Sequence, residues 1–472
     1  MRVAQVAFGV LGLAAVACSR GATTNDRVAS SGGGGLGEDA AVVTITTDPD
    51  VAAIAAAVSV DRITQSIEAL VGFGTRSSCS DDTGGAQGIG GARDWVKAQL
   101  DAIGGVQTQL LSFLQTGCTS TFMREDVVAV LPGAGHPQRI VVVGGHYDSR
   151  TVDVTDGVSP APGANDSGSQ TALVLEVARD FAGHSFDATL VFVAFAGEEQ
   201  GLVGSAALVS GMTSLVPDGH VVAMLNCDIV GGDNSVEDAS SLQQFRLYSP
   251  GTPREETTPG TTDDTSPSRG LMRYVATWGG AYVPAMTIIP ELQEDRPGRH
   301  GDHESFISAA LPGVRFIEPN ENLAHEHTAQ DLFEYVTPAY TASVAQVVSA
   351  VAASLARAPD APVGIGATGN AALVKLSWTA PATGNVDHYV VAARPVTENF
   401  YHARVLVEGA AAGASVTPAA LEVDASSPYF VSVAAVDSAG HESLFAYPEY
   451  RCDASACIVP AAATDVTAIA TP

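Results

Sequence analysis

Basic residues are scarce in this chain. Only 23 lysine and arginine residues accompany 52 aspartate and glutamate residues among 472, and charged residues make up 16% of the sequence. The net charge of −29 would repel nucleic-acid phosphates and anionic lipid, which argues against both as partners. The 46% of hydrophobic residues suffices for a real core, so we expect two folded units plus tails.

The start of the chain lacks a hydrophobic run long enough for a permanent membrane anchor. One early charge, Arg2, precedes an apolar stretch from about Val6 to Ala17, which is too short to span a bilayer. This pattern is typical of an export signal, and we assign residues 1–17 to a signal peptide. The protein is therefore expected to be secreted or held in the cell envelope.

Two forms of export remain open. The small residues up to Ala17 fit ordinary signal-peptidase cleavage, whereas AVAC resembles a lipobox in which Cys18 is lipidated, with Ala15 at the position usually held by Leu. Membrane attachment is expected only through a lipidated Cys18. Residues 18–55 are Gly/Ser-rich at their start and are predicted to be a flexible leader.

Cysteine is also infrequent, and no CxxC pair with a matching partner exists, which argues against a sulfur-ligated zinc site. Since an exported protein meets oxidising conditions, the positions of the cysteines make two disulfides plausible, Cys79 to Cys118 and Cys452 to Cys457. Cys227 lies in the apolar VVAMLNCDIV and is expected to be a buried free thiol.

Residues 56–356 alternate between helical and strand-like patterns. The helical segments are DRITQSIEALVGF, GARDWVKAQLDAIGG, SGSQTALVLEVARDFAG, GLVGSAALVSGM and YTASVAQVVSAVAASLARA. The strand-like segments are DVVAVLPG, IVVVGGHYD, TLVFVAFAG, VVAMLNCDIV, AMTIIP and GVRFIE. Near-continuous apolar strands separated by helices predict an α/β fold with a mostly parallel, mixed sheet between helices.

Three of the predicted strands end in residues that can bind metal or move protons. His146 ends IVVVGGH, Glu198 and Glu199 follow TLVFVAFAG, and Asp228 ends VVAMLNCD. Any one of these could be a cap or turn residue. Ligands bind beyond the carboxyl ends of parallel strands, so three such endings together indicate a functional site.

Two further residues belong with this group. Asp166 lies in GANDSGS at the start of a predicted helix, and His327 lies in HTAQD on a late loop. Asp166 alone could be a helix N-cap. With the strand ends, however, these residues form a set of nitrogen and oxygen donors.

In these motifs the sequence resembles the di-zinc aminopeptidases of the bacterial leucyl aminopeptidase and aminopeptidase Y type, a family that includes glutamate carboxypeptidase relatives and glutaminyl cyclases. The match extends over roughly 300 residues in the family's order. Its motifs are GGHYDS, GANDSGSQTA, AGEEQGLVGS, NCDIVG, GDHESF and HTAQD.

The resemblance implies a site for two zinc ions. His146 and Asp228 would hold one ion, Glu199 and His327 the other, and Asp166 would bridge them. A bridging carboxylate offsets the repulsion between two cations a few Å apart and leaves room for a shared water.

The resemblance also implies roles for two carboxylates that are not ligands. Glu198 would be the general base, taking a proton from the water and passing it to the leaving amine. Asp148 would orient the imidazole of His146, as carboxylates behind metal ligands do.

The sequence departs from the family's pattern at several points. The segment 147–165 is longer than in many relatives and is predicted to loop out near the cleft. Glu326 stands where many relatives have a Tyr that stabilises the oxyanion, so the residue with that role is not placed. We interpret His325 as an exposed loop residue and His303 as a structural support.

Near residue 357 the pattern changes to short, alternating strands, which predict a small all-β sandwich over 357–450. It resembles a fibronectin type III module, and its aromatic residues are expected to be core. The residues that carry this resemblance are Trp378, Tyr389, Leu421 and Tyr429. Residues 451–472 are predicted to be a loose tail pinned by its small cysteine loop.

The favoured hypothesis is an exported zinc-dependent aminopeptidase that acts on peptide substrates, its acidic cleft receiving the substrate's ammonium group. A carboxypeptidase or glutaminyl cyclase-like activity is the first alternative, for which Arg296 and Arg299 would be candidates to bind a substrate carboxylate. The second alternative is a non-catalytic cell-surface binding protein. The sequence leaves the oligomeric state and the side-chain specificity open.

Overall fold

The computed structural model describes residues 45–460, apart from 82–84, 251–265, 294, 297–298, 409–412 and 417–419. The predicted signal peptide, Cys18 and most of the predicted leader lie outside the described residues, as does the end of the predicted tail.

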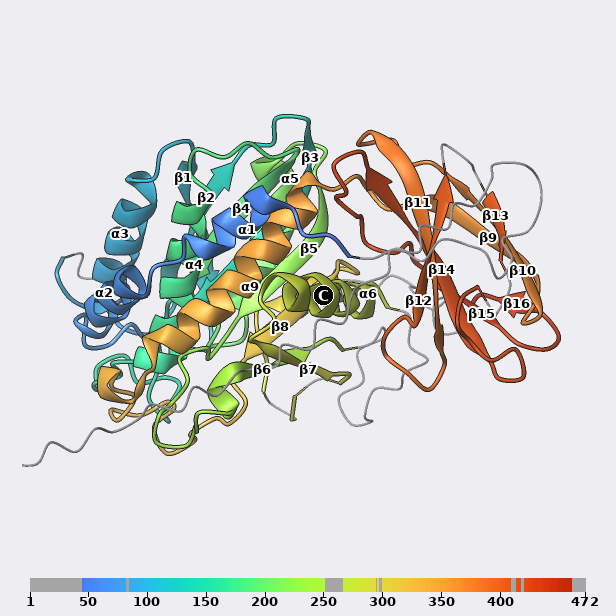
Figure 1. Ribbon diagram of the computed structural model, residues 1–472. Helices are drawn as coiled ribbons and strands as arrows, with labels where there is room; N and C mark the ends of the chain where they lie inside the picture. The colour runs from blue at the N-terminus through green and yellow to red at the C-terminus, as the bar shows by residue number, and fades with distance from the viewer. Residues whose placement is uncertain are drawn as a thin grey trace, which may run out of the picture.

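A mixed eight-stranded sheet forms the centre of the larger unit (Figure 1). Its strand order is β1-β2-β4-β3-β5-β8-β6-β7, in which β4, β3, β5 and β8 run parallel as four neighbours. The strands span β1 Gln107–Gln115, β2 Phe122–Leu131, β3 His136–His146, β4 Ala188–Phe195, β5 His220–Cys227, β6 Gln244–Tyr248, β7 Thr287–Glu291 and β8 Gly313–Ile317.

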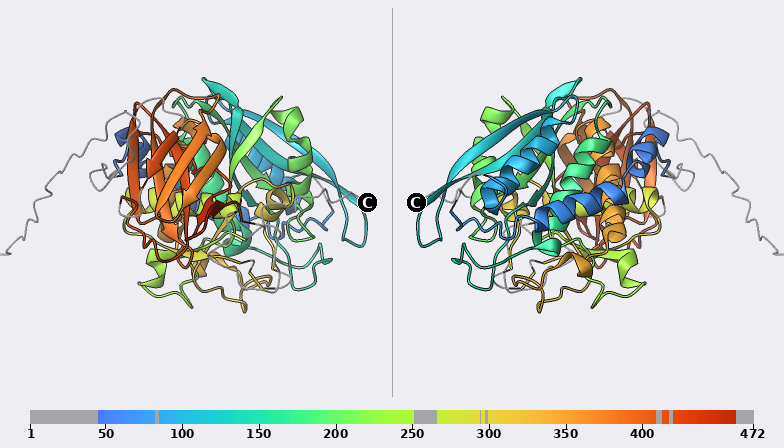
Figure 2. Two further views of the ribbon diagram at one scale, coloured as in Figure 1. Left: turned by 90° about the vertical axis from the view of Figure 1, so that its right-hand side faces the viewer. Right: turned by 90° about the vertical axis from the view of Figure 1, so that its left-hand side faces the viewer.

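Helices cover both faces of this sheet (Figure 2). One face carries α2 Val60–Val71, α3 Gly88–Asp101, α4 Gln170–Asp180 and α9 Pro338–Arg357, and the other carries α5 Val203–Leu215 and α8 His303–Ser308. Shorter helices are α6 Pro267–Tyr274 and α7 Gly280–Tyr282, with helical turns η1 Ala164–Ser169, η2 Ser241–Gln243, η3 Val275–Gly279 and η4 Phe333–Tyr335.

The alternation of side chains along β3 shows why the sheet is buried on both sides. Val141 and Val143 pack in the cluster that contains the residues of α4 and α9. Ile140 and Val142 pack in the opposite cluster, with Leu208 of α5. All four valine and isoleucine side chains of β3 are fully buried, as a strand covered on two faces requires. The predicted α/β class with a mostly parallel, mixed sheet between helices is confirmed.

Local sequence explains the helices that support the sheet. In α2, Ser59 caps the N-terminus by accepting a hydrogen bond from the Arg62 amide at 3.3 Å. Ile63, Ile67 and Leu70 recur at helical spacing and are fully buried. Helix α9 is apolar and long enough to cross a membrane, but 83% of its most apolar 18-residue stretch is buried inside the protein. It is therefore a core helix.

The smaller unit consists of a three-stranded sheet, β13-β10-β9, and a five-stranded sheet, β12-β11-β14-β15-β16, both antiparallel. Their inward residues form one core, in which the rings of Trp378 and Tyr389 pack edge to face with their centroids 5.1 Å apart. The strands are β9 Val363–Asn370, β10 Leu373–Thr379, β11 Val386–Pro395, β12 Ala403–Glu408, β13 Gly413–Val416, β14 Tyr429–Asp437, β15 Tyr450–Cys452 and β16 Cys457–Ile458.

The structure corrects the two predicted ends of the folded region. Helix α1, Pro49–Ala56, covers the last residues of the predicted leader and packs on α9 because Val51 and Ile54 are apolar and buried. Strand β15 begins one residue before the predicted loose tail, and β16 lies inside it. They form the edge of the five-stranded sheet, where β15 pairs with β14 and Cys452 of β15 lies opposite Cys457 of β16.

The two units are joined by a buried ionic contact. Glu449 of the sandwich accepts hydrogen bonds from Arg273 of α6 at 3.1 Å and from Arg394 of β11 at 2.7 Å. The Tyr401 hydroxyl donates to the same carboxylate at 2.8 Å. Because both carboxylate oxygens of Glu449 accept hydrogen bonds, the buried charge is compensated.

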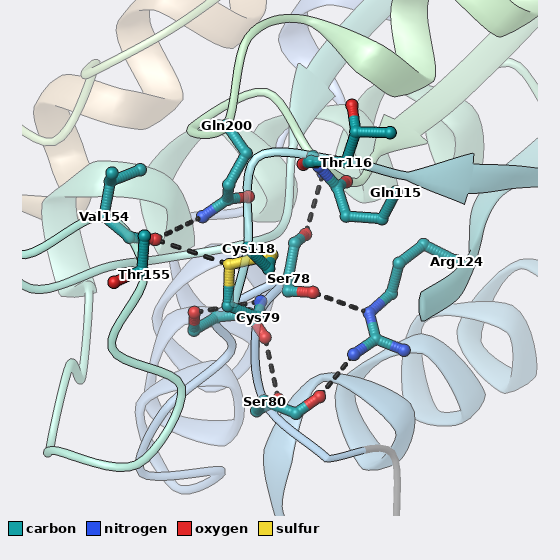
Figure 3. Close-up of a disulfide and its surroundings, with 12 residues drawn as sticks. Ser78, Cys79, Ser80, Gln115, Thr116, Cys118, Arg124, Val154, Thr155 and Gln200 are labelled. Atoms are coloured by element: carbon teal, nitrogen blue, oxygen red, sulfur yellow. Dashed lines mark hydrogen bonds between the residues drawn. A yellow bond between two sulfur atoms is a disulfide. The ribbon is translucent and has the colours of Figure 1, made fainter. Parts of the chain in front are cut away.

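The cysteine predictions are confirmed. Cys79 is joined to Cys118 and Cys452 to Cys457, while Cys227 is free and buried. Figure 3 shows that the first disulfide lies beside Val154 and Gln200, which are close in sequence to predicted site residues.

Candidate active site

Three neighbouring strands bring the predicted residues to one edge of the sheet. His146 is the last residue of β3, Asp228 follows β5 directly, and Glu198 and Glu199 follow β4 in the turn before α5. Because β4, β3 and β5 are adjacent and parallel, their carboxyl ends lie side by side.

Asp166 lies between two histidines. Its Oδ1 is 3.2 Å from Nε2 of His146, and its Oδ2 is 3.0 Å from Nε2 of His327. The side chain of Asp166 is 4% exposed. One carboxylate therefore connects the end of β3 to the loop that carries His327.

Each histidine also faces a second carboxylate. His146 Nε2 lies 3.4 Å from Oδ1 of Asp228, and His327 Nε2 lies 3.3 Å from Oε2 of Glu199. The ligand atoms of His146, Asp166 and Glu199 all lie within 4.8 Å of one another. The structure thus brings the five predicted ligands together as two groups that share Asp166, one with His146 and Asp228 and one with Glu199 and His327. Ligand atoms of Asp166, Glu326 and His327 also lie within 4.8 Å of one another, and Glu326 was not predicted.

The donor set suits divalent cations. All five side chains offer imidazole nitrogen or carboxylate oxygen, and Oδ1 of Asp166 and Oε1 of Glu199 are buried without a hydrogen-bond partner. Buried carboxylate oxygens of this kind are normally compensated by hydrogen bonds or by metal. These residues therefore fit metal ions of the borderline type that take nitrogen and oxygen ligands.

The pKa values of the two histidines show the same preference for positive charge. Burial lowers the pKa of His146, but the surrounding carboxylates, Glu198 first, raise it well above its usual value. Burial also lowers the pKa of His327, but Glu199 and Asp166 outweigh this effect and raise the pKa to about 10. The pocket stabilises cations at the positions of the two imidazole rings.

Asp331 fixes the bridging carboxylate from behind. Its two carboxylate oxygens accept the backbone amides of Asn165 at 2.8 Å and of Asp166 at 2.9 Å. Asp331 is the last residue of the HTAQD motif, so the motif that supplies His327 also holds the turn that carries Asp166. The Asp166–Ser167 peptide bond in this turn is cis.

Two site segments have strained backbones. His327 has φ of 56° and Ile229, directly after Asp228, has φ of 54°. The left-handed region is rare for a β-branched residue such as Ile229 and costs roughly 1–2 kcal/mol per residue. The surrounding contacts maintain this strain, including the hydrogen bond from the Glu318 amide to the Ile229 carbonyl oxygen at 2.9 Å.

Comparison with known proteins assigns the chain to a family. Residues 126–352 match the model of peptidase family M28. A probable zinc metalloprotease of Leptosphaeria maculans is 34% identical over 383 residues, covering 75% of this chain and 88% of the relative. The chain belongs to peptidase family M28. A second relative, a probable zinc metalloprotease of Pyricularia oryzae, is 38% identical over 340 residues, covering 66% of this chain and 67% of the relative.

Solved structures agree on the fold of this M28 peptidase. The LapA aminopeptidase of Legionella pneumophila superimposes with a TM-score of 0.51 at 21% identity, covering 67% of this chain and 76% of LapA. LapB from the same organism gives a TM-score of 0.50 at 19% identity, covering 66% of this chain and 77% of LapB. The match to the M28 model ends at residue 352, before the sandwich.

Asp148 contacts His146 of the M28 site mainly through its backbone. The Asp148 carbonyl oxygen lies 3.1 Å from His146 Nδ1, and its carboxylate Oδ1 lies at 3.5 Å. The carboxylate also accepts a hydrogen bond from Ser78 Oγ at 3.2 Å. The backbone oxygen is thus the nearer acceptor for an N–H on Nδ1, and the predicted carboxylate contact is the longer one.

Glu198 lies among other acids of the M28 site. Burial raises its pKa well above the usual range; His146 opposes this shift, and Asp228 and Glu199 add to it. A carboxyl group held in this way takes up a proton more readily than one in water. Glu198 is therefore a buried carboxyl group whose surroundings favour its protonated form, beside a residue predicted to be a ligand.

Sequence reasoning did not identify two arginines that touch the predicted ligands. Arg315 of β8 places Nε 2.9 Å from Oδ2 of Asp228, and Arg150 places Nε 2.8 Å from Oε2 of Glu199. A signal was present for each: Arg315 is a charged residue inside the apolar strand GVRFIE, and Arg150 follows the motif GGHYDS directly.

Another unpredicted contact involves Gln170, the first residue of α4, whose Nε2 lies 2.9 Å from His146 Nε2. His325 is not the exposed loop residue that we expected. Its Nδ1 lies 2.7 Å from Asp233 Oδ2 and its ring stacks on Tyr335 at 4.0 Å, so it holds the loop before His327. His303 is buried in α8, as a structural support would be.

Proposed function

We propose that this M28 peptidase is a zinc-dependent aminopeptidase that removes N-terminal residues from peptides. The observation that carries the proposal is the position of Asp166, whose two carboxylate oxygens face two different histidines. The two relatives compared above are named probable zinc metalloproteases, which supports zinc as the metal.

The proposed ligands are His146, Asp228, Glu199 and His327, with Asp166 shared between two ions. Bound zinc would polarise the scissile carbonyl and acidify the attacking water. Glu198, which burial biases toward accepting a proton, takes the proton of that water and delivers it to the nitrogen of the leaving amine. Asp331 and Arg315 hold Asp166 and Asp228 in place meanwhile.

The arginines near the cleft favour an aminopeptidase over a carboxypeptidase. Arg296 and Arg299, the candidates for binding a substrate carboxylate, are both paired with Glu321, at 3.1 and 2.8 Å. Arg299 also contacts Glu326. Their charges are therefore used within the protein, whereas the acidic site itself suits an ammonium group.

We also propose that the protein is exported and that the sandwich is a fibronectin type III-like module. Disulfides such as Cys79–Cys118 persist in oxidising compartments, which supports export. The two antiparallel sheets around Trp378 and Tyr389 support the module. Whether Cys18 is lipidated is tested by the mass of the mature N-terminal peptide, since a diacylglyceryl group would add to it.

The proposed function is tested by amino-acid release from a leucyl peptide with a free N-terminus and from the same peptide N-acetylated. We expect release only from the free peptide, loss of activity after treatment with a metal chelator, and recovery with added zinc. Equal cleavage of both peptides would contradict an aminopeptidase. Cleavage that persists in chelator would contradict metal dependence, and binding without cleavage would favour the non-catalytic alternative.

A further inference from the structure

The residue directly before His327 in this chain is an acid. Glu326 precedes His327, and its side chain is 8% exposed and contacts Arg299. Its Oε1 lies 3.6 Å from Nε2 of His327. A carboxylate here would repel negative charge on a substrate oxygen, so the stabilising donor must be a different residue.

Among the described residues, Arg150 is an arginine whose side chain contacts both Glu199 and His327. Its Nε lies 2.8 Å from Oε2 of Glu199, and its Nη2 lies 2.7 Å from Nδ1 of His327. Its side chain is 23% exposed. The guanidinium thus spans two residues at the proposed metal centre and still reaches solvent, from which a substrate enters.

Other arginines around the site are already compensated. Arg315 is 2% exposed and lies between Asp228 and Asp295, at 2.9 and 3.5 Å. Arg76 is fully buried and donates to backbone carbonyl oxygens, including that of Tyr147 at 2.7 Å. Neither of these guanidinium groups is placed to meet a substrate.

The charges around Arg150 change when the site is filled. Glu199 is a proposed zinc ligand, so its carboxylate charge is then shared with a cation. Beside a filled site, the guanidinium of Arg150 therefore lacks a full counter-charge. An oxygen that gains negative charge next to it would supply that counter-charge.

We propose that Arg150 is a catalytic residue, which donates hydrogen bonds to the oxygen of the scissile carbonyl and stabilises its negative charge while water attacks the carbon. The inference rests on the proposed peptide hydrolysis and names a donor for it. Since the donor carries a full positive charge, its hydrogen bonds to an oxygen that gains negative charge are stronger than those of a neutral donor.

The loop that carries Arg150 is anchored at both ends. Ser149 Oγ donates to the Ala161 carbonyl oxygen at 2.8 Å and accepts the Arg76 amide at 3.1 Å. Further along, the Val154 carbonyl oxygen accepts a hydrogen bond from Gln200 Nε2 at 3.3 Å, next to the Cys79–Cys118 disulfide (Figure 3). These contacts hold the guanidinium in position before substrate binds, as preorganised stabilisation requires.

The test compares Arg150→Gln and Arg150→Lys with the wild type, each loaded with zinc and analysed for metal content. Steady-state kinetics use a leucyl peptide. Calorimetry measures binding of the phosphonic acid analogue of leucine, which carries a tetrahedral anion, and of leucine itself. Arg296→Gln is the matched control, because Arg296 is 44% exposed and pairs with Asp295 and Glu321.

For Arg150→Gln we expect a fall in kcat of about 10²- to 10³-fold with little change in KM, as when one oxyanion donor is removed. The phosphonate should lose affinity by a similar factor while leucine binding and zinc content are kept. Arg150→Lys should recover part of both losses, and Arg296→Gln should behave as the wild type.

Two results would overturn this role. If Arg150→Gln kept the kcat and the phosphonate affinity of the wild type, the guanidinium would not contact the substrate. Loss of zinc from the variant would show that it only holds Glu199 and His327. A wild-type enzyme that cleaves no free peptide would instead contradict the proposed function, and the phosphonate titration would still test Arg150.

Discussion

Arg315 Nε lies 2.9 Å from Oδ2 of Asp228, and the other oxygen of that carboxylate faces His146 at 3.4 Å. Burial acts to raise the pKa of Asp228, but Arg315 and His146 lower it below its usual value. The arginine therefore keeps the carboxylate charged and points one oxygen toward the proposed metal centre. Arg315 would act on a metal bound by Asp228 only through that carboxylate, which would make it a positioning residue.

Replacing Arg315 should weaken metal binding. In Arg315→Met, we expect the affinity for one of two zinc ions to fall about 10- to 100-fold, as when other groups that orient ligands are removed. Competition with a chromophoric chelator measures this affinity. The metal-free variant should also melt at a lower temperature than the metal-free wild type, because Asp228 is left buried without its partner. Arg296→Met, at an exposed side chain, is the control, and unchanged zinc affinity in Arg315→Met would contradict the role.

Glu198→Gln should separate metal binding from catalysis. The amide keeps the shape of the side chain but cannot accept the proton, so we expect two zinc ions per chain and a fall in kcat of about 10²- to 10⁴-fold. Metal analysis and peptide hydrolysis check the two parts. Glu334→Gln, at an exposed position in η4, should match the wild type. Activity retained in Glu198→Gln would remove Glu198 from the role of base.

The Cys79–Cys118 disulfide should stabilise the fold more than Cys452–Cys457. The two bonds close loops with sequence separations of 39 and 5 residues. The chain-entropy relation then gives about 4 kcal/mol for the first and about 2 kcal/mol for the second. Thermal unfolding of the two double Cys→Ser variants without reductant measures the difference. Under strong reductant each variant should melt with the reduced wild type, and a difference that persists there would contradict the disulfide as its cause.

Glu449 should make the junction between the two units sensitive to acid. Burial acts to raise its pKa, but Arg273 and Arg394 lower it to about 2 from the ordinary value of 4.5. A lowered pKa gives stability that is fully present above about 4.5 and is lost as the pH falls toward 2, an effect on the order of 3 kcal/mol. Urea unfolding at pH 5 and pH 3 measures this loss.

Glu449→Gln is the matched variant for the acid effect. It should be less stable than the wild type at pH 5, because the charges of Arg273 and Arg394 lose their partner. The difference between the two proteins should shrink at pH 3. Glu408→Gln, at an exposed position of β12, should show the wild-type dependence. A difference that stays constant from pH 5 to pH 3 would contradict the assignment to Glu449.

The ends of the folded region show where sequence patterns were insufficient. The segment before residue 56 was predicted to be a leader, although Val51 and Ile54 pack on α9. Eight residues of helix give too short a periodic signal to stand out, and α1 is stable only because α9 covers it. Strands β15 and β16 are shorter still, so only the pairing of β15 with β14 and of β16 with β15 identifies them.

The arginines of the site were out of reach for a related reason. A charged residue inside a strand, such as Arg315, can be recognised as unusual, but its partner Asp228 is 87 positions away and directly follows another strand. Arg150 lies on a loop whose path is set by contacts with Arg76 and Gln200, which no local pattern encodes.

The sequence by itself determined the class of fold and the residue types at the ends of the strands. Hydrophobic periodicity is a local property, and the motifs place donors at defined points along it. Tertiary structure alone decided which oxygen of Asp166 faces which histidine and which arginines touch Glu199 and Asp228. Those relationships depend on distances between chain segments far apart in sequence, and only packing of the whole sheet and its helices fixes them.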